Sequence, residues 1–319
     1  MTTLVLQNSL LKVEFLPEFG GKIVSLRSVR TGEEFILPPL KDYAHIGCSA
    51  DFGASDGGGF DECLPSVASC EKIAGEPSVP DHGDLWRIPW HADSQDDGII
   101  VLHAESVSRP LRLTRKASLE EATLVLEYEL TNLSDRPTSW LWSAHPLLRV
   151  HAGDRILLPD EIDVVEVEFS ADDLFKNKIS IPWPIARLSS GILTDLSSVP
   201  RRDGSTAHKL FARMGRAGWC ALYRRELGQG LVLRFDPNAL PFLGLWICAG
   251  AWPSTGAAKQ YTVALEPTTS GADSLDSAVQ TGTSRILNAR EHFCWRLDLQ
   301  LLGAFEPTDF ENFAVAARL

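Results

Sequence analysis

The chain has 319 residues, of which 44% are hydrophobic and 23% charged, and its formal net charge is −12. This composition is typical of a folded protein with a large apolar core, and it excludes a disordered, collagen-like or coiled-coil chain. The acidic balance argues against nucleic acid or an anionic membrane surface as the main partner, because both bind to basic patches. A small ligand recognised by a few local groups agrees better with this charge.

The sequence also gives an expectation for the cellular compartment of the protein. The N-terminal segment lacks the basic start and apolar run of a signal peptide. The most apolar stretch, residues 240–252, is shorter than the roughly 20 residues that cross a bilayer. The 6 cysteines form no CxxC pair, which is typical of free thiols in a reducing compartment. We therefore expect a soluble, cytoplasmic protein with no membrane partner.

Short alternating or β-branched segments recur along the chain, each bounded by Gly, Pro, Asn, Asp or Ser, and they predict strands joined by turns. The predicted strands are residues 4–6, 11–16, 22–28, 99–104, 111–118, 123–132, 139–142, 164–169, 219–224, 231–235, 261–266 and 294–301. The fifth and sixth predict an antiparallel hairpin that turns at residues 120–122. Leu124, Leu126, Tyr128 and Leu130 fall on one face of its second strand.

Helical patterns are few and short. Residues 170–176 and the stretch after Asp309 are the best examples. Strands do not alternate with long amphipathic helices, which argues against a doubly wound fold. The prediction is an all-β protein of mostly antiparallel strands, a sandwich or an open barrel, forming a single domain over residues 1–319.

Two loops carry polar groups suited to a hydroxyl-rich ligand. In the first, Asp61 and Glu62 follow a run of glycines and lie beside Phe60, so they could present acceptors next to an apolar platform, although a surface turn explains the loop equally well. In the second, His82 precedes a glycine and is flanked by acids and tryptophans, with Arg87 close behind. A histidine donor beside indole faces is typical of a sugar pocket.

Two apolar segments each contain one ionisable residue immediately before a proline. His145 lies in residues 140–148 and Glu266 in residues 262–269. A histidine at the rim of a sheet can have a pKa near neutrality. An unpaired carboxylate in a buried strand is costly, so Glu266 should have a partner or a ligand. We expect each proline to end regular strand pairing.

Four segments, taken together and in order, resemble the aldose 1-epimerase (galactose mutarotase-like) family. They are residues 19–26 (FGGKIVSL), the turn around His82, residues 144–147 (AHPL) and residues 265–267 (LEP), and the resemblance extends over about residues 4–302. It implies a β-supersandwich with a sugar site on its concave face. It also implies that His145 is the general acid, that Glu266 is the general base, and that His82 binds and polarises the sugar.

The sequence departs from this family at two positions. The arginine that many mutarotases carry before the first histidine has no clear counterpart, and the loop with Asp61 and Glu62 stands in that region. Asp236 is the match for the family's binding aspartate, and Trp246 is one of the tryptophans next to the site segments. The departures leave the chemistry in place and the substrate open.

The chemistry needs one acid and one base. Anomer exchange removes the proton from the C1 hydroxyl and donates one to the ring oxygen, and rotation before reclosure inverts the anomeric centre. A glutamate with a pKa of about 4.3 is ionised at neutral pH and can be the base, and a histidine with a pKa of about 6.5 can be the donor. We expect neither a metal nor an organic cofactor.

Three alternatives remain open at the level of sequence. A non-catalytic carbohydrate-binding or sensing protein could use the same cleft. A lyase or hydrolase would need a carboxylate pair, which Asp61 or Glu62 near Glu266 would supply. A sugar phosphate would need a local basic spot, for which Arg87, Arg149 and Lys22 are the residues available. Oligomeric state is not indicated.

Overall fold

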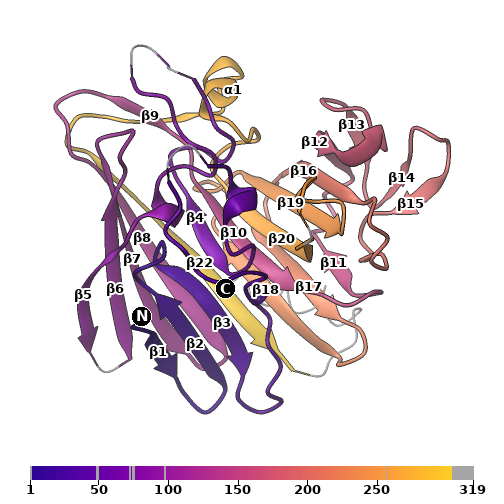
Figure 1. Ribbon diagram of the computed structural model, residues 1–319, viewed down its shortest axis with the longest axis horizontal. Coiled ribbons are helices and arrows are strands. Elements are labelled where there is room, and N and C mark those ends of the chain that lie inside the picture. The colour runs from indigo at the N-terminus through magenta and orange to yellow at the C-terminus, as the bar shows by residue number, and fades with distance from the viewer. Residues whose placement is uncertain are drawn as a thin grey trace.

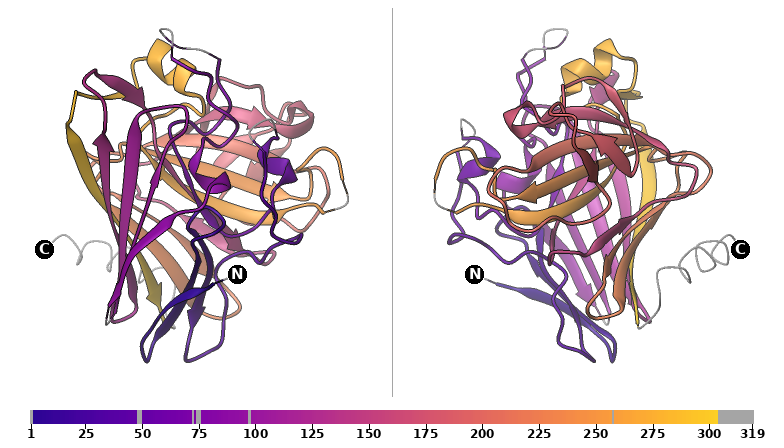
Figure 2. Two further views of the ribbon diagram at one scale, coloured as in Figure 1. Left: turned by 60° about the vertical axis from the view of Figure 1, so that its left-hand side comes forward. Right: turned by 90° about the vertical axis from the view of Figure 1, so that its right-hand side faces the viewer.

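The computed structural model describes residues 2–47, 50–71, 73, 76–96, 98–256 and 258–303. Two large antiparallel sheets face each other, and the short helix α1 (Leu275–Gln280) lies at one end of the molecule (Figures 1 and 2). The predicted all-β class with mostly antiparallel strands is confirmed. The single domain over residues 1–319 stays a prediction.

The larger sheet has ten strands. In sheet order they are β1 (Leu4–Gln7), β2 (Leu11–Leu16), β3 (Lys22–Ser28), β4 (Phe60–Cys63), β10 (Ser143–Arg149), β20 (Tyr261–Thr268), β19 (Phe242–Ala249), β16 (Ala207–Arg213), β12 (Val164–Ser170) and β13 (Ser180–Pro182). Neighbouring strands often come from distant parts of the chain, so the middle of this sheet joins segments that sequence order separates.

The smaller sheet has eight strands. In sheet order they are β11 (Arg155–Leu157), β17 (Trp219–Arg224), β18 (Gln229–Phe235), β22 (His292–Leu302), β8 (Thr123–Asn132), β7 (Leu111–Glu120), β6 (Ile99–Glu105) and β5 (His91–Asp96). Two further pairs join β14 (Ile185–Arg187) to β15 (Leu193–Asp195) and β9 (Thr138–Trp140) to β21 (Arg285–Leu287). Single 3₁₀ turns occupy Phe52–Ala54, Leu85–Arg87 and Ala171–Asp173.

The main core lies between the facing sides of the two sheets. The hairpin β7–β8 forms as predicted, and Leu124, Leu126 and Leu130 on its inner face are fully buried, with Tyr128 nearly so. Full burial of a large apolar side chain stabilises a fold by about 1.5–3 kcal/mol. The alternating pattern is visible in the sequence because the opposite face of these strands is partly exposed.

Several central strands of the larger sheet were not predicted, although β20 among them was. In β4, β10 and β16 nearly every residue is buried, so the two-residue alternation that marks a half-buried strand is missing. The apolar stretch 240–252 contains strand β19, which the sequence analysis also did not assign. Pro146 and Pro267 were expected to end pairing, and this was wrong, because both lie inside their strands.

The helix predictions also need correction. Of residues 170–176, only Ala171–Asp173 form a 3₁₀ turn, in which Asp172 has a left-handed φ of 50°. Helix α1 was not predicted; the Ser274 side chain caps it by accepting a hydrogen bond from the Ser277 amide. The stretch after Asp309 lies outside the described residues. Nowhere in the described ranges does a helix have the length and apolar character needed to cross a membrane.

Candidate active site

A cavity of about 190 Å³ lies over the middle strands of the ten-stranded sheet. Its polar wall is formed by His82, His145, Lys209, Gln260, Glu266 and Asp273. Its aromatic wall is formed by Phe52, Phe169, Trp246 and Trp252. The volume is below the roughly 300–1,000 Å³ of pockets for drug-sized ligands, so the cavity suits one small molecule.

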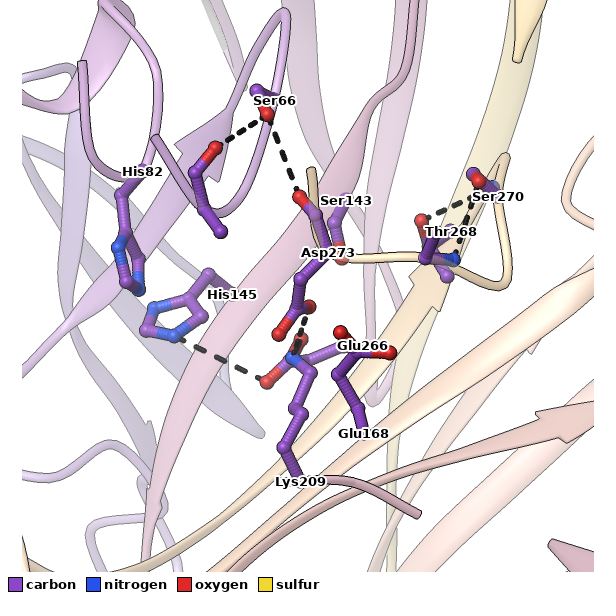
Figure 3. Close-up of polar contacts among 12 residues, drawn as sticks. Ser66, His82, Ser143, His145, Glu168, Lys209, Glu266, Thr268, Ser270 and Asp273 are labelled. Carbon is purple, nitrogen blue, oxygen red and sulfur yellow. Dashed lines mark hydrogen bonds and ion pairs between the residues drawn. The ribbon is translucent and has the colours of Figure 1, made fainter. Parts of the chain in front are cut away.

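The strand register brings His145 and Glu266 to one face. Strands β10 and β20 are neighbours, and the pairs Ser143↔Thr268 and Leu147↔Ala264 set His145 opposite Glu266 between them. Side chains that face each other across neighbouring strands project from the same side of the sheet. The two residues therefore meet at the cavity although they are distant in sequence (Figure 3).

The His145 and Glu266 side chains are close and incompletely paired. The Nε2 atom of His145 lies 4.0 Å from Oε1 of Glu266, and both side chains are buried. Among the described residues, neither Oε1 of Glu266 nor Nδ1 of His145 has a hydrogen-bond partner. A buried polar atom without a partner is costly, so these atoms indicate a site prepared for a polar ligand.

Burial shifts the two pKa values in opposite directions. It lowers the pKa of His145 well below 6.5, and the charges of His82, Lys209 and Lys22 lower it further. Burial raises the pKa of Glu266; Lys209 opposes this change, and Asp273 adds to it. Perturbed values of this kind are typical of catalytic groups in clefts.

Lys209 is a member of the site that the sequence analysis missed. Its ammonium group forms a short ion pair with Oε2 of Glu266 and lies 3.5 Å from Oδ1 of Asp273. Burial alone would lower its pKa, but Asp273 and Glu266 outweigh burial and raise it, so Lys209 is protonated. The only signal in the sequence was a lysine inside an apolar segment.

His82 lies in a turn that places its ring over the cavity. The ring stacks on Phe52 with centroids 4.2 Å apart and meets the His145 ring edge-on at 4.9 Å. Its Nδ1 atom is 3.0 Å from Oδ1 of Asp81. Arg87 does not line the cavity; its guanidinium donates hydrogen bonds to the carbonyls of Gly47 and Asp81 and so holds the loops beside the site.

Asp61 and Glu62 point to opposite faces of the sheet. Asp61 lies opposite His145 in register, outside the cavity wall, with its Oδ2 atom 3.0 Å from Nζ of Lys22. Burial raises the pKa of Asp61 to about 6, and Lys22 limits the rise. Glu62 faces the core, where it accepts hydrogen bonds from Arg115, Tyr128 and Trp142.

These contacts bear on two alternatives from the sequence analysis, a hydrolase or lyase with a carboxylate pair and a site for a sugar phosphate. Glu62 cannot pair with Glu266 across a substrate, because the sheet separates them. Lys22 is engaged by Asp61 and by Asp56 at 2.7 Å, so it is not available to a phosphate in the cavity.

Two further predicted residues fall on different sides of the molecule. Trp246 on β19 lines the cavity, and its Nε1 donates to Oε1 of Gln260 at 3.1 Å. Asp236 is exposed after strand β18 of the other sheet, where its Oδ1 accepts from the backbone and side chain of Asn238. Asp236 is therefore not part of the cavity, and neither is Arg149, which is exposed at the end of β10.

The fold is that of the galactose mutarotase-like β-sandwich proteins, as the solved structures show. A candidate aldose 1-epimerase from Escherichia coli K12 superposes with a TM-score of 0.70 at 17% identity, over 95% of this chain and 99% of that chain. A galactose mutarotase related enzyme from Lactobacillus acidophilus gives 0.66 at 14% identity, over 96% and 99%. A galactose mutarotase-like protein from Lactobacillus casei gives 0.65 at 15%, over 94% and 100%.

No protein-family profile matches the chain, and no curated protein sequence matches it. The likeness to the solved structures is therefore a likeness of fold. Function has to be argued from the residues of the cavity.

Proposed function

We propose that this protein is an aldose 1-epimerase-like enzyme that interconverts the anomers of one monosaccharide, or of a monosaccharide derivative, in the cavity above β10 and β20. The observation that carries the proposal is the approach of His145 Nε2 to Glu266 Oε1 at 4.0 Å, with both groups buried. The fold and the small volume of the cavity add support. We also expect the protein to act in the cytoplasm.

In the proposed reaction Glu266 removes the proton from the C1 hydroxyl while His145 donates a proton to the ring oxygen, and the ring opens to the free aldehyde. Rotation about the C1–C2 bond presents the other face of the aldehyde, and the reverse proton transfers close the ring. A positioned acid and a positioned base each contribute typically about 10²–10⁴-fold. Every proton taken up by one group is balanced by one released from the other.

The reaction needs one proton on the His145–Glu266 pair. When both groups are protonated no base is present, and when both are deprotonated no acid is present. The pH dependence of the rate should therefore be bell-shaped, with both limbs belonging to the coupled pair. Because Glu266 has a raised pKa and His145 a lowered one, we assign neither limb to a single residue.

The charges around the cavity favour an uncharged sugar over a sugar phosphate. Lys209 is the cation of the described cavity wall, and it already faces the carboxylates of Glu266 and Asp273. A phosphate would therefore meet two negative groups and one neutralised positive group. The aromatic wall, which includes Trp246 and Trp252, suits the apolar face of a pyranose ring.

The test is anomer exchange measured by NMR across a panel of aldoses. Glu266→Gln and His145→Asn should each reduce the rate at least about 100-fold, because each removes one proton-transfer group. Asp236→Asn is the matched control, since Asp236 lies outside the cavity, and it should keep the wild-type rate. Full activity in both site variants would refute the assignment of the pair.

A non-catalytic sugar-binding protein remains the second candidate, favoured by the aromatic wall alone. It would show saturable binding of a sugar with no acceleration of exchange above buffer. Measuring binding and exchange on the same samples separates the two functions.

A further inference from the structure

Lys209 and Glu266 form an ion pair across an intervening strand. Lys209 is on β16 and Glu266 on β20, and β19 lies between them. Strands in a sheet are about 4.8 Å apart, so the pair spans roughly 10 Å of backbone. Only a long side chain such as lysine can reach that far.

The residue of β19 beneath this ion pair is a glycine. Gly244 is paired in register with Glu266 on one side and with Phe211 on the other. A Cβ atom at position 244 would lie 3.0 Å from Oε2 of Glu266 and 3.4 Å from Nζ of Lys209. The absence of a side chain at Gly244 therefore leaves the space in which the two charged groups meet.

The pairing leaves one carboxylate oxygen of Glu266 available. Lys209 contacts Oε2, whereas Oε1 faces His145 and has no hydrogen-bond partner among the described residues. On the other side, Asp273 approaches Lys209 at 3.5 Å. The main-chain carbonyl of Asp273 accepts hydrogen bonds from the amides of Val67 and Ala68. It also accepts one from the Ser66 hydroxyl at 3.4 Å (Figure 3), and these bonds fix the segment.

We propose that Lys209 is a positioning residue of this site: its ammonium group, extended over Gly244 and steadied by Asp273, holds Oε2 of Glu266 so that Oε1 is presented to the substrate and to His145. This inference rests on the proposed function, because it assigns a role in the same proton transfer. Lys209 acts through Glu266, and the role requires both its charge and the empty position at Gly244.

The same contact sets the proton affinity of the acid–base pair. Lys209 lowers the pKa of Glu266 and also that of His145, whereas Asp273 raises the pKa of Glu266. Among the described residues, the other charged or titratable groups around the pair include His82 in its turn, Lys22 on β3, Cys63 and Asp61 on β4, and Glu168 on β12. Glu168 is itself paired with Lys178.

The first test is Lys209→Met, which keeps the length of the side chain and removes its charge. An opposite charge within about 4–6 Å shifts a carboxylate pKa by about 1–3 pH units. Without Lys209, the pair should bind its protons more tightly, so both limbs of the pH profile should move to higher pH, the acid limb by about 1 unit or more. Activity at pH 7 should fall at least about tenfold and recover in part at alkaline pH.

Two variants check this interpretation. Asp273→Asn removes the carboxylate that raises the pKa of Glu266, so its acid limb should move to lower pH, opposite to Lys209→Met. Lys116→Met removes an exposed lysine that pairs with Glu127 on the other sheet, and its profile should match wild type. An unshifted profile in Lys209→Met, in folded protein, would overturn the proposal.

Gly244→Ala tests the geometry while keeping every charge. The added methyl group would press on Oε2 and Cβ of Glu266 and on Nζ of Lys209, which are side-chain atoms and not backbone, so the protein should fold. We expect kcat to fall at least about tenfold with KM changed less than about threefold, because the carboxylate is displaced while the rest of the wall is intact. Wild-type kcat would overturn the proposal. This variant also serves if Lys209→Met does not fold.

A readout without substrate separates this inference from the proposed function. Titration of ¹³C-carboxyl-labelled glutamate by NMR, with the Glu266 resonance assigned by its loss in Glu266→Gln, measures the carboxylate directly. Its pKa should rise in Lys209→Met and fall in Asp273→Asn, whether or not any sugar is turned over. If these shifts appear but no aldose is epimerised, the proposed function fails and the electrostatic link stands; if no shift appears, the inference fails by itself.

Discussion

His145 Nε2 and Glu266 Oε1 lie 4.0 Å apart because β10 and β20 are paired in one particular register. The preceding residues on the two strands, Ala144 and Leu265, are buried in the core between the sheets. A slip of one residue between these strands would turn one catalytic candidate into the core. The proximity of these two side chains is thus a product of strand register.

Glu62 should be required for stability and not for proton transfer. It is buried with Arg115, Tyr128 and Trp142 as partners. Removal of one partner from a buried ion pair typically costs about 3–5 kcal/mol, so Glu62→Ala should lower the free energy of unfolding by about that amount in urea titrations. Glu127→Ala, at an exposed pair, should cost less than about 1 kcal/mol. If Glu62→Ala lowered the free energy of unfolding as little as Glu127→Ala, the result would contradict the stabilising role of the buried Glu62 contacts.

Trp246 should contribute to sugar affinity and little to the chemical step. Its indole lines the cavity and is held by Gln260. An aromatic contact is worth about 0.5–1.5 kcal/mol, which corresponds to a KM increase of up to about tenfold in Trp246→Ala. Trp246→Phe keeps a ring face and should stay nearer to wild type. Steady-state kinetics separate the two constants, and an unchanged KM in Trp246→Ala would remove Trp246 from the binding wall.

Gly83 should be essential to the turn that carries His82. Its φ is +69°, and a Cβ atom there would lie 2.1 Å from the carbonyl oxygen of Leu64. Gly83→Ala should therefore lower the free energy of unfolding by more than the roughly 1–2 kcal/mol of a left-handed φ alone. Gly153→Ala is the control, because its φ is +88° and no atom lies within 4 Å. Equal losses in the two variants, measured by urea unfolding, would argue against the close contact.

His208 should make the fold sensitive to acid. Burial lowers its pKa from 6.5 to about 4, and a hydrogen bond joins its Nδ1 atom to Oγ of Ser170. Between pH 6.5 and pH 4, His208 is protonated in the unfolded chain but neutral in the folded protein. Protonation therefore favours the unfolded chain, and the free energy of unfolding decreases as the pH falls through this range. The decrease amounts to about 2 kcal/mol between pH 7 and pH 5.

His208→Gln should remove that pH-dependent part. Urea unfolding measures how much the free energy of unfolding decreases between pH 7 and pH 5. This decrease should be smaller in the variant than in the wild type by about 2 kcal/mol. An identical pH dependence in the two proteins would show that His208 does not titrate in this range.

The sequence predicted the strands with one partly exposed face better than the fully buried strands and the short edge strands. The hairpin β7–β8 was predicted because one face of each strand meets the core and the other meets solvent, which leaves an alternating pattern. Strands β4, β10, β16 and β19 were not predicted because both of their faces are covered. Residues on one face of these strands pack in the core and those on the other face lie at the cavity or under loops. Their sequences therefore lack the two-residue alternation of apolar and polar side chains.

The candidate site was predicted only in part. The sequence and its family resemblance named His145, Glu266, His82 and Trp246, and all four line the cavity. They also named four residues that do not line the cavity. Asp61 is paired with Lys22, and Glu62 lies in the core. Arg87 holds the loops beside the site, and Asp236 lies on the other sheet. The sequence and the resemblance did not name Lys209, Asp273, Phe52 and Trp252, which line the cavity.

By itself, the sequence determined that the chain is an acidic β-protein with one histidine and one glutamate inside apolar segments, since composition and local pattern carry that information. Tertiary structure alone decided which charged residues meet. Asp61 and Glu62 are adjacent in sequence and face opposite sides of a sheet, whereas Lys209 reaches Glu266 across a strand that supplies only Gly244. The physical reason is that strand pairing and register, which no local pattern encodes, set the distance between groups from distant segments of the chain.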